Sequence, residues 1–300
     1  MTALLVLTAA ALAADPGLAW KQTDHSLALA RGDELLWQFN YARSEGKPYF
    51  HPVRVGGETV TDLRPADHPW HRGVWFSWKL VNGVLYWEED PKTGKAPGET
   101  ELVEARATPR DDHSARFDLK LAYHPPGKPP VLTEARTVEV SPPARDGSYH
   151  IDWRSVFTAG DADVTLDRTP VPGEKGGVDW GGYAGLSLRL APALKKWRFA
   201  DAGGPVTGRA KDARWMAFAG PTRGGSAVLA VLDHPASFRH PTPWYLINDM
   251  PYFSPAVLYR SPYTLPAGQA LTLRHRILLA PGALDAAALD TLWRRYADGR

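Results

Sequence analysis

The sequence predicts an all-β protein: a large antiparallel β-sandwich that ends in a short helix. Short runs with an apolar residue at every second position fill most of the chain, and clusters of Gly, Pro, Asp and Asn separate them. A chain of 300 residues with 44% hydrophobic residues can bury a sizeable core, and large all-β folds of this length often form one domain. We therefore expect one domain over residues 15–300.

The elements follow in order from the same pattern. Strand-like alternation is clearest at residues 27–29, 34–39, 81–86, 115–121, 137–140, 150–157, 186–190, 226–232 and 271–279. One helix is expected, from Leu284 to Tyr296, with Asp285 near its first turn and an apolar face that includes Leu289 and Trp293. We expect this helix to cap an edge of the sandwich.

Composition limits the chemistry. The formal net charge is +2 and the 35 Lys and Arg residues are spread along the chain, so nothing indicates a nucleic-acid partner. The chain has no cysteine, which excludes disulfides, thiolate zinc sites, iron–sulfur clusters and cysteine nucleophiles. Histidine and carboxylate side chains are left as metal ligands or acid–base groups.

The N-terminal residues 1–14 are typical of a signal peptide. An apolar stretch from Ala3 is followed by small residues up to Ala14, although no Lys or Arg follows Met1. We expect a periplasmic or secreted protein; a buried first helix or strand is the alternative. No later stretch has the 18 or more apolar residues of a membrane span.

The densest group of functional side chains lies in the sequence RPADHPWHRG, between Arg64 and Gly73. A buried strand would need a partner for every titratable group, and a solvent loop has little use for tryptophan. This mixture suits a cleft that holds a hydroxyl-rich ligand against aromatic faces, with histidine available for proton transfer. The candidate residues here are Asp67, His68, Trp70, His71 and Arg72.

The preceding stretch Tyr49–Arg54 adds His51 and Arg54 to this group, and a short connection would bring them close to it. For any one of the histidines, the alternative role is a hydrogen bond to loop backbone. We expect no cofactor. A divalent metal held by His51, His68 and His71 is the alternative, although the two-histidine helix of zinc peptidases is absent.

A second group of candidate residues follows residue 233. The tripeptide Asp67-His68-Pro69 recurs as Asp233-His234-Pro235, which suggests that two loops bring similar chemistry to one place. Aromatic faces would stack on sugar C–H surfaces, and arginine would supply paired hydrogen bonds. The candidates in this part and in the glycine-rich turn before residue 185 are Tyr183, His234, His240, Trp244, Tyr252 and Arg260. The paired carboxylates of the acidic run Glu88–Asp90 can divide acid and base roles, but such a run is more typical of a solvated turn, so Glu88 is a second-tier candidate.

These motifs resemble those of the PmoA-like family of bacterial β proteins, which often carry the label "methane oxygenase". The shared segments are Tyr49–Val53, Arg64–Gly73, Gly181–Leu186 and Pro251–Ala256. A membrane oxygenase subunit would show spanning helices, so we set that label aside. The resemblance implies a supersandwich of the galactose-mutarotase-like group, in which histidines and a carboxylate on a concave sheet act on a pyranose.

Together these observations favour a carbohydrate-active enzyme of epimerase, hydrolase or lyase type. One histidine or Asp67 would remove a proton while a second histidine donates one, and Arg54, Arg72 or Arg260 would steady an oxyanion. The catalytic candidates are His51, Asp67, His68, His71 and His234. Two alternatives stay open: a non-catalytic carbohydrate-binding or cell-envelope protein, and a histidine-ligated metal-dependent oxygenase or hydrolase.

Overall fold

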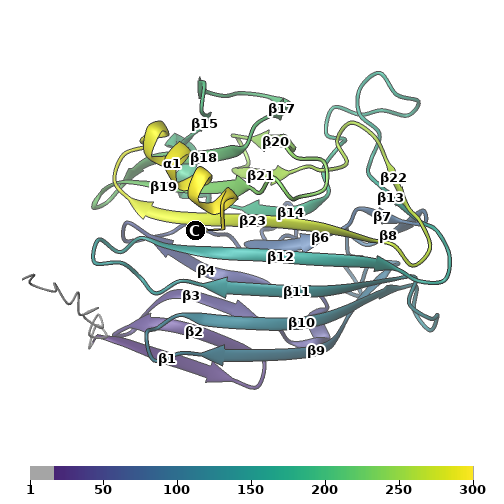
Figure 1. Cartoon of the computed structure of the whole chain (residues 1–300), viewed down its shortest axis with the longest axis horizontal. Coiled ribbons are helices and arrows are strands. Elements are labelled where there is room, and N and C mark those ends of the chain that lie inside the picture. Colours follow the sequence, from purple (N-terminus) through teal and green to yellow (C-terminus); the bar gives the residue numbers. More distant parts are fainter. Residues whose placement is uncertain (1–16, 300) are drawn as a thin grey trace, which may run out of the picture.

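Two large antiparallel sheets face each other and enclose the main hydrophobic core, as a computed structural model of the chain shows (Figure 1). The structure describes residues 17–299, so the predicted signal peptide lies outside the described residues. A third, four-stranded sheet and one C-terminal helix complete the fold. The prediction of an all-β antiparallel sandwich with a short C-terminal helix is confirmed.

The three sheets are assembled from segments that lie far apart in the sequence. The ten-stranded sheet has the order β1 (Leu18–Thr23), β2 (Ser26–Arg31), β3 (Glu34–Asn40), β4 (Tyr49–Val55), β6 (Val74–Ser77), β14 (Gly185–Arg189), β21 (Tyr252–Pro255), β20 (Pro243–Ile247) and β17 (Arg209–Asp212), and β5 (Glu58–Thr59) pairs with β4. The nine-stranded sheet has the order β16 (Gly204–Pro205), β15 (Arg198–Asp201), β18 (Trp215–Thr222), β19 (Gly225–Asp233), β23 (Ala270–Pro281), β12 (Tyr149–Ala159), β11 (Leu132–Val140), β10 (Ala115–His124) and β9 (Glu99–Pro109). The small sheet contains β22 (Tyr263–Leu265), β13 (Val164–Asp167), β7 (Leu80–Val81) and β8 (Val84–Leu85), and 3-10 turns lie at Arg43–Glu45 and Pro192–Lys196.

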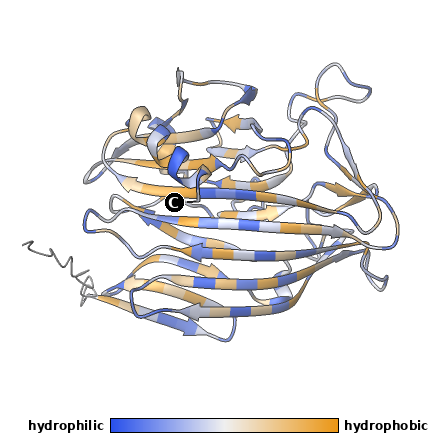
Figure 2. Ribbon diagram, in the orientation of Figure 1, coloured by the Kyte–Doolittle hydropathy of each residue, from blue (hydrophilic) through white to orange (hydrophobic). Residues whose placement is uncertain are grey.

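Burial follows the sequence alternation in the nine-stranded sheet. Along β11, β12 and β23, buried residues alternate with partly exposed ones, and Figure 2 shows the matching alternation of hydropathy. One face of each strand packs into the sandwich and the other meets solvent, which is what a period of two predicts.

Helix α1 (Ala286–Ala297) covers the outer face of the nine-stranded sheet. Asp285 caps its first turn by accepting hydrogen bonds from the backbone nitrogens of Ala287 and Ala288. Leu289 and Tyr296 pack in a cluster with residues of β18 and β19, among them Trp215. The helix therefore covers part of a sheet face, and the prediction that it caps an edge is wrong, because the apolar outer residues of β18 and β19 need a cover.

The middle of the ten-stranded sheet breaks the alternation, because β6, β14 and β21 are buried on both faces. A row of residues across four strands, Phe50, Val74, Leu188 and Phe253, belongs to the core between the sheets. The residues on the opposite face, including Tyr49, Trp75 and Tyr252, belong to a separate buried cluster. A bridge between Thr61 and Leu190 bonds segment 60–73 to the residue that follows β14, and a bridge between Leu63 and Arg72 joins two parts of the segment to each other.

We call segment 60–73 the covering segment, and Gly73 connects it to β6. No other residue type fits the position of Gly73. Its φ is +63°, and a Cβ there would lie 2.3 Å from the Phe50 carbonyl oxygen. Its nitrogen donates a hydrogen bond to the Asp62 oxygen, and its own oxygen accepts one from the Arg189 nitrogen. Gly73 therefore lets the covering segment approach the sheet backbone closely.

We expect Gly73→Ala to lower the free energy of unfolding by more than about 2 kcal/mol, because a left-handed conformation costs roughly 1–2 kcal/mol and the Phe50 oxygen must also move. Gly83→Ala is the matched control, since Gly83 has a φ of +74° but no atom within 4 Å of the added carbon. Urea denaturation measures both. Equal losses in the two variants would show that the close approach is unimportant.

Candidate functional site

The candidate site lies on the outer face of the ten-stranded sheet, where β4, β6, β14 and β21 meet. Buried aromatic side chains form the base of the site, which we call the floor, and polar side chains surround it. The buried aromatic residues of the floor are Tyr49, Trp75, Trp87, Tyr245 and Tyr252. Three polar clusters border this floor, and we describe them in turn.

The histidine cluster comprises Asp67, His68, His71 and Arg189. The Asp67 Oδ2 lies 3.0 Å from His68 Nδ1, and Arg189 Nη2 donates to both carboxylate oxygens at 2.9 Å. Partial burial would raise the pKa of Asp67, but the hydrogen bonds from His68 and Arg189 outweigh it and lower that pKa. Asp67 is thus an anion that joins the exposed His68 ring to a buried guanidinium.

His71 is stacked within this cluster. Its ring lies 4.6 Å from that of His68 and 5.4 Å from that of Tyr252, nearly parallel to both. Burial, together with the positive charges of His68 and Arg189, lowers the pKa of His71 to about 2, so the ring is neutral at physiological pH. Three buried nitrogens of the cluster, His71 Nδ1 and Arg189 Nε and Nη1, find no hydrogen-bond partner within residues 17–299. Such atoms normally bind water or a ligand.

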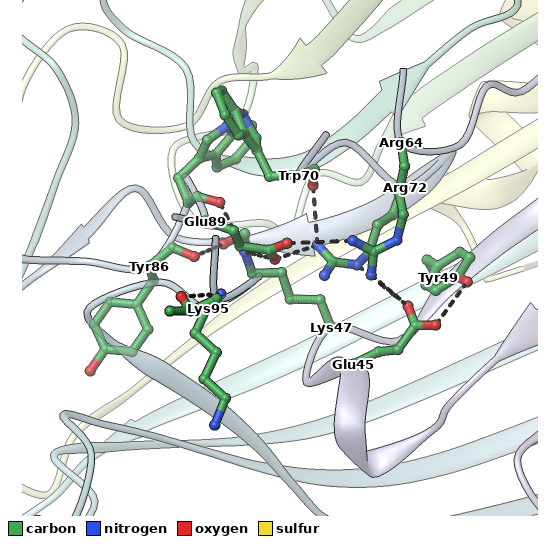
Figure 3. Close-up of polar contacts among 12 residues, drawn as sticks. Glu45, Lys47, Tyr49, Arg64, Trp70, Arg72, Tyr86, Glu89 and Lys95 are labelled. Carbon is green, nitrogen blue, oxygen red and sulfur yellow. Dashed lines mark hydrogen bonds and ion pairs between the residues drawn. The ribbon is translucent and has the colours of Figure 1, made fainter. Parts of the chain in front are cut away.

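The Glu89 cluster comprises Glu45, Lys47, Arg64, Arg72 and Glu89, and it anchors the covering segments (Figure 3). Glu89 Oε1 lies 2.6 Å from Arg72 Nη1 and 3.1 Å from Lys47 Nζ, while Arg64 lies 3.7 Å from its other oxygen. Arg64 also pairs with Glu45 at 3.3 Å. Burial lowers the pKa of Lys47 to about 8, although the negative charge of Glu89 acts to raise it. The cluster is a closed ionic network, too enclosed to receive a substrate.

The Lys79 cluster comprises Lys79, Glu88 and Tyr183. Lys79 Nζ and the Tyr183 hydroxyl contact the same Glu88 oxygen, and Lys79 Nζ lies 2.9 Å from Tyr183 Oη. Trp87 connects this cluster to the histidine cluster, because its ring lies 4.9 Å from that of Tyr183 and 6.4 Å from that of His71. Glu88 thus belongs to the Lys79 cluster, whereas the adjacent Glu89 belongs to the Glu89 cluster.

Several predicted residues come together here. Asp67, His68, Trp70, His71 and Tyr252 are in mutual contact, and Arg72 and Tyr183 lie in the adjoining clusters. His51 lies near them, where its Nδ1 is 2.9 Å from Thr61 Oγ1. Burial lowers the pKa of His51, while the charge of Asp62 opposes that shift.

Of the second predicted group, Tyr183 and Tyr252 join this site but His234 and His240 do not, so the prediction that the two Asp-His-Pro loops converge is wrong. His234 packs against Tyr296 of α1, and His240 pairs with Asp233 at 2.7 Å and stacks on Trp293. These residues follow β19 of the nine-stranded sheet, whereas His68 precedes β6 of the ten-stranded sheet. The main core separates the two groups.

Three further predicted ligand residues are engaged elsewhere. The Trp244 side chain is fully buried in the core between the sheets, so its ring presents no face to a ligand and that prediction is wrong. Arg54 is bound to Glu34 and Thr59, and Arg260 pairs with Asp212. Neither arginine contacts the histidine cluster in the part of the chain that the structure describes.

Metal binding finds no support in the geometry. Within the described range 17–299, no three His, Asp or Glu side chains are grouped so that they could hold a metal ion. His51, His68 and His71 therefore do not form the three-ligand set that the metal-dependent alternative requires.

Sequence reasoning missed four residues of the site, Lys47, Lys79, Glu89 and Arg189, and gave Glu88 only as a second-tier candidate. The interpretation of Glu88–Asp90 as a solvated turn is wrong for Glu89, which is 8% exposed. The available signal was the position of the two glutamates directly after Trp87, since acidic residues beside a large aromatic residue often line a covered site.

The chain belongs to a family of unknown function, DUF6807, whose model matches residues 26–294. Among solved structures it is similar to an alpha-galactosidase from Lactobacillus brevis, with a TM-score of 0.44 and 12% sequence identity; the match covers 89% of this chain and 39% of that enzyme. No curated protein matches the sequence. No helix within residues 17–299 has the length and apolar character to cross a membrane. The resemblance to the PmoA-like family and the signal peptide stay predictions.

Glu89→Gln should lower the free energy of unfolding by about 3–5 kcal/mol, because it leaves the buried Lys47 and Arg72 without their counter-charge. Glu104→Gln is the control: Glu104 pairs with Lys120 in solvent and should change stability by less than about 0.5 kcal/mol. Urea denaturation compares the two, and similar small losses would argue against the anchoring role of Glu89.

His71 should make stability depend on pH. Its pKa is about 2 in the folded protein against 6.5 for a free side chain, so its contribution is complete above pH 6.5 and is lost as the pH falls toward 2. The loss is up to about 1.4 kcal/mol per pH unit. We expect His71→Phe to flatten the decline in unfolding free energy between pH 6 and 4; parallel curves would contradict the assignment.

Proposed function

We propose that the protein is a carbohydrate-active enzyme in which His68, oriented by Asp67, transfers a proton to or from a sugar. The observation that supports this most strongly is the Asp67–His68 pair, stacked on a neutral histidine and beside buried nitrogens that lack partners. Epimerisation, hydrolysis and elimination all need such a group.

The Asp67–His68 pair has the arrangement of an oriented base. A carboxylate that accepts a hydrogen bond from Nδ1–H fixes the tautomer and leaves Nε2 to accept or donate a proton. The His68 side chain is 35% exposed and can be reached by a substrate. Arg189 holds both oxygens of Asp67, so the carboxylate is fixed although nearly half of it meets solvent.

His71 and Arg189 supply the polar partners for a sugar. A neutral imidazole can hydrogen-bond to a hydroxyl as donor or acceptor, and Arg189 Nη1, which has no hydrogen-bond partner among residues 17–299, can donate to hydroxyl, ring or carboxylate oxygens. Trp70 lies edge-on to His68 with 5.5 Å between ring centroids and adds apolar surface beside the pair. Polar groups set against aromatic surface are what recognition of a sugar requires.

We expect His68→Ala to lower the rate about 10²–10⁴-fold, the usual contribution of a general acid or base, and Asp67→Asn to lower it with little change in KM. The purified protein is assayed on a panel of reducing sugars and glycosides by optical rotation and by release of reducing ends. Thermal denaturation confirms that both variants stay folded. His25→Ala is the control, since His25 is exposed and distant in the sequence.

Full activity in His68→Ala would overturn the proposal. Sugar binding by the wild type with no turnover on the whole panel would favour the alternative, a non-catalytic carbohydrate-binding protein.

A further inference from the structure

The Lys79 cluster presents an unused hydrogen-bond acceptor beside the proposed catalytic pair. Glu88 Oε1 already contacts both Lys79 Nζ and the Tyr183 hydroxyl, which donates to it at 2.9 Å. Glu88 Oε2 is buried and has no hydrogen-bond partner among residues 17–299. A buried carboxylate oxygen of this kind normally accepts a hydrogen bond from a hydroxyl or amide.

The other two members keep this acceptor in place. Lys79 is 5% exposed and supplies the positive charge that offsets Glu88. Burial raises the pKa of Tyr183, and the charge of Glu88 raises it further, so its hydroxyl stays protonated as a donor. The Tyr183 hydroxyl is thus a fixed donor to Glu88 Oε1, which leaves Glu88 Oε2 as the unpartnered oxygen of the cluster.

Trp180 stands beside this cluster as an exposed aromatic surface. Its side chain is 53% exposed, and Val103 is the only other large apolar residue of the described range that is exposed. Its ring centroid lies 6.0 Å from Lys79 Nζ. An exposed tryptophan offers a flat apolar face on which a sugar ring can pack.

The backbone around Trp180 is tightly packed, which fixes the position of its ring. The Trp180 carbonyl accepts a hydrogen bond from the Tyr245 hydroxyl at 3.0 Å. A Cβ on Gly181 would lie 2.1 Å from the Pro170 oxygen, and one on Gly182 would lie 2.4 Å from the Tyr259 ring. The turn therefore holds the Trp180 backbone rigidly, and little conformational freedom is lost when a ligand binds.

A row of packed rings links Trp180's neighbour Tyr183 to the histidine cluster. Tyr183 contacts Trp87, which is buried, and Trp87 contacts His71, with 4.9 and 6.4 Å between the ring centroids. His68 and Trp180 thus stand at two ends of the same aromatic floor, and a ligand that contacts both needs more than one ring.

We infer that Trp180 and Glu88 form a second sugar-binding subsite, so that the substrate is an oligosaccharide or a glycoside with a second ring. Trp180 would stack on the C–H face of that ring, while Glu88 Oε2 accepts a hydrogen bond from one of its hydroxyls. This inference rests on the proposed function, because it assumes that the first ring binds at the histidine cluster.

The test measures binding of a panel of monosaccharides and of the disaccharides that contain them, by isothermal titration calorimetry. Wild-type protein should bind at least one disaccharide about tenfold or more tightly than its component monosaccharides. Trp180→Leu should remove this preference and leave monosaccharide binding unchanged, whereas Trp180→Tyr, which keeps an aromatic face, should retain most of it. Glu88→Gln should weaken disaccharide binding, and His68→Ala should keep the preference while it loses turnover.

A disaccharide preference that survives in Trp180→Leu would overturn the subsite and leave the proposed function intact. Equal affinity of the wild type for monosaccharides and disaccharides would overturn it as well. If His68→Ala keeps full turnover while the disaccharide preference still depends on Trp180, the catalytic proposal is refuted and the subsite stands. Absence of binding to every sugar would overturn both.

Discussion

Glu89 is a carboxylate with only 8% of its side chain exposed, and three cations from two other parts of the chain surround it. Lys47 precedes β4, Arg64 and Arg72 belong to the covering segment, and Glu89 itself follows β8. A charge removed from water must be neutralised by partners at close range, so these segments have to meet. The position of the covering segment, and with it the position of His68 and His71, depends on that requirement.

The two outer faces of the sandwich are covered in different ways, and this difference places the site. The nine-stranded sheet carries a helix over small and apolar residues such as Ala217 and Ala230. The ten-stranded sheet carries irregular segments over large aromatic residues, and their many charged groups all need partners. A helix satisfies its own backbone and offers a closed surface. Irregular segments that end in side-chain clusters leave buried polar atoms, such as those of His71 and Arg189, without hydrogen-bond partners among residues 17–299.

The sequence predicts the strands well where one face meets solvent, as in β11 and β12, because the alternation then appears directly in the residue types. It predicts the histidine segment because charged and aromatic residues seldom occur together without a function. It could not place Arg189, which lies 122 residues from its partner Asp67. The repeated Asp-His-Pro motif was misleading for the same reason: Asp67 and Asp233 adjoin strands of different sheets, and a tripeptide carries no information about sheet order.

Exposure separates the roles of the charged groups at the site. Lys47, Arg72 and Arg189 are at most 5% exposed, and each holds a carboxylate in place. His68 is the titratable ring that reaches solvent, and it does so while joined to a carboxylate that Arg189 fixes from below. The proposed function places proton transfer on His68, because it alone in that cluster combines an imidazole ring with access from solvent, while its buried neighbours hold its orientation.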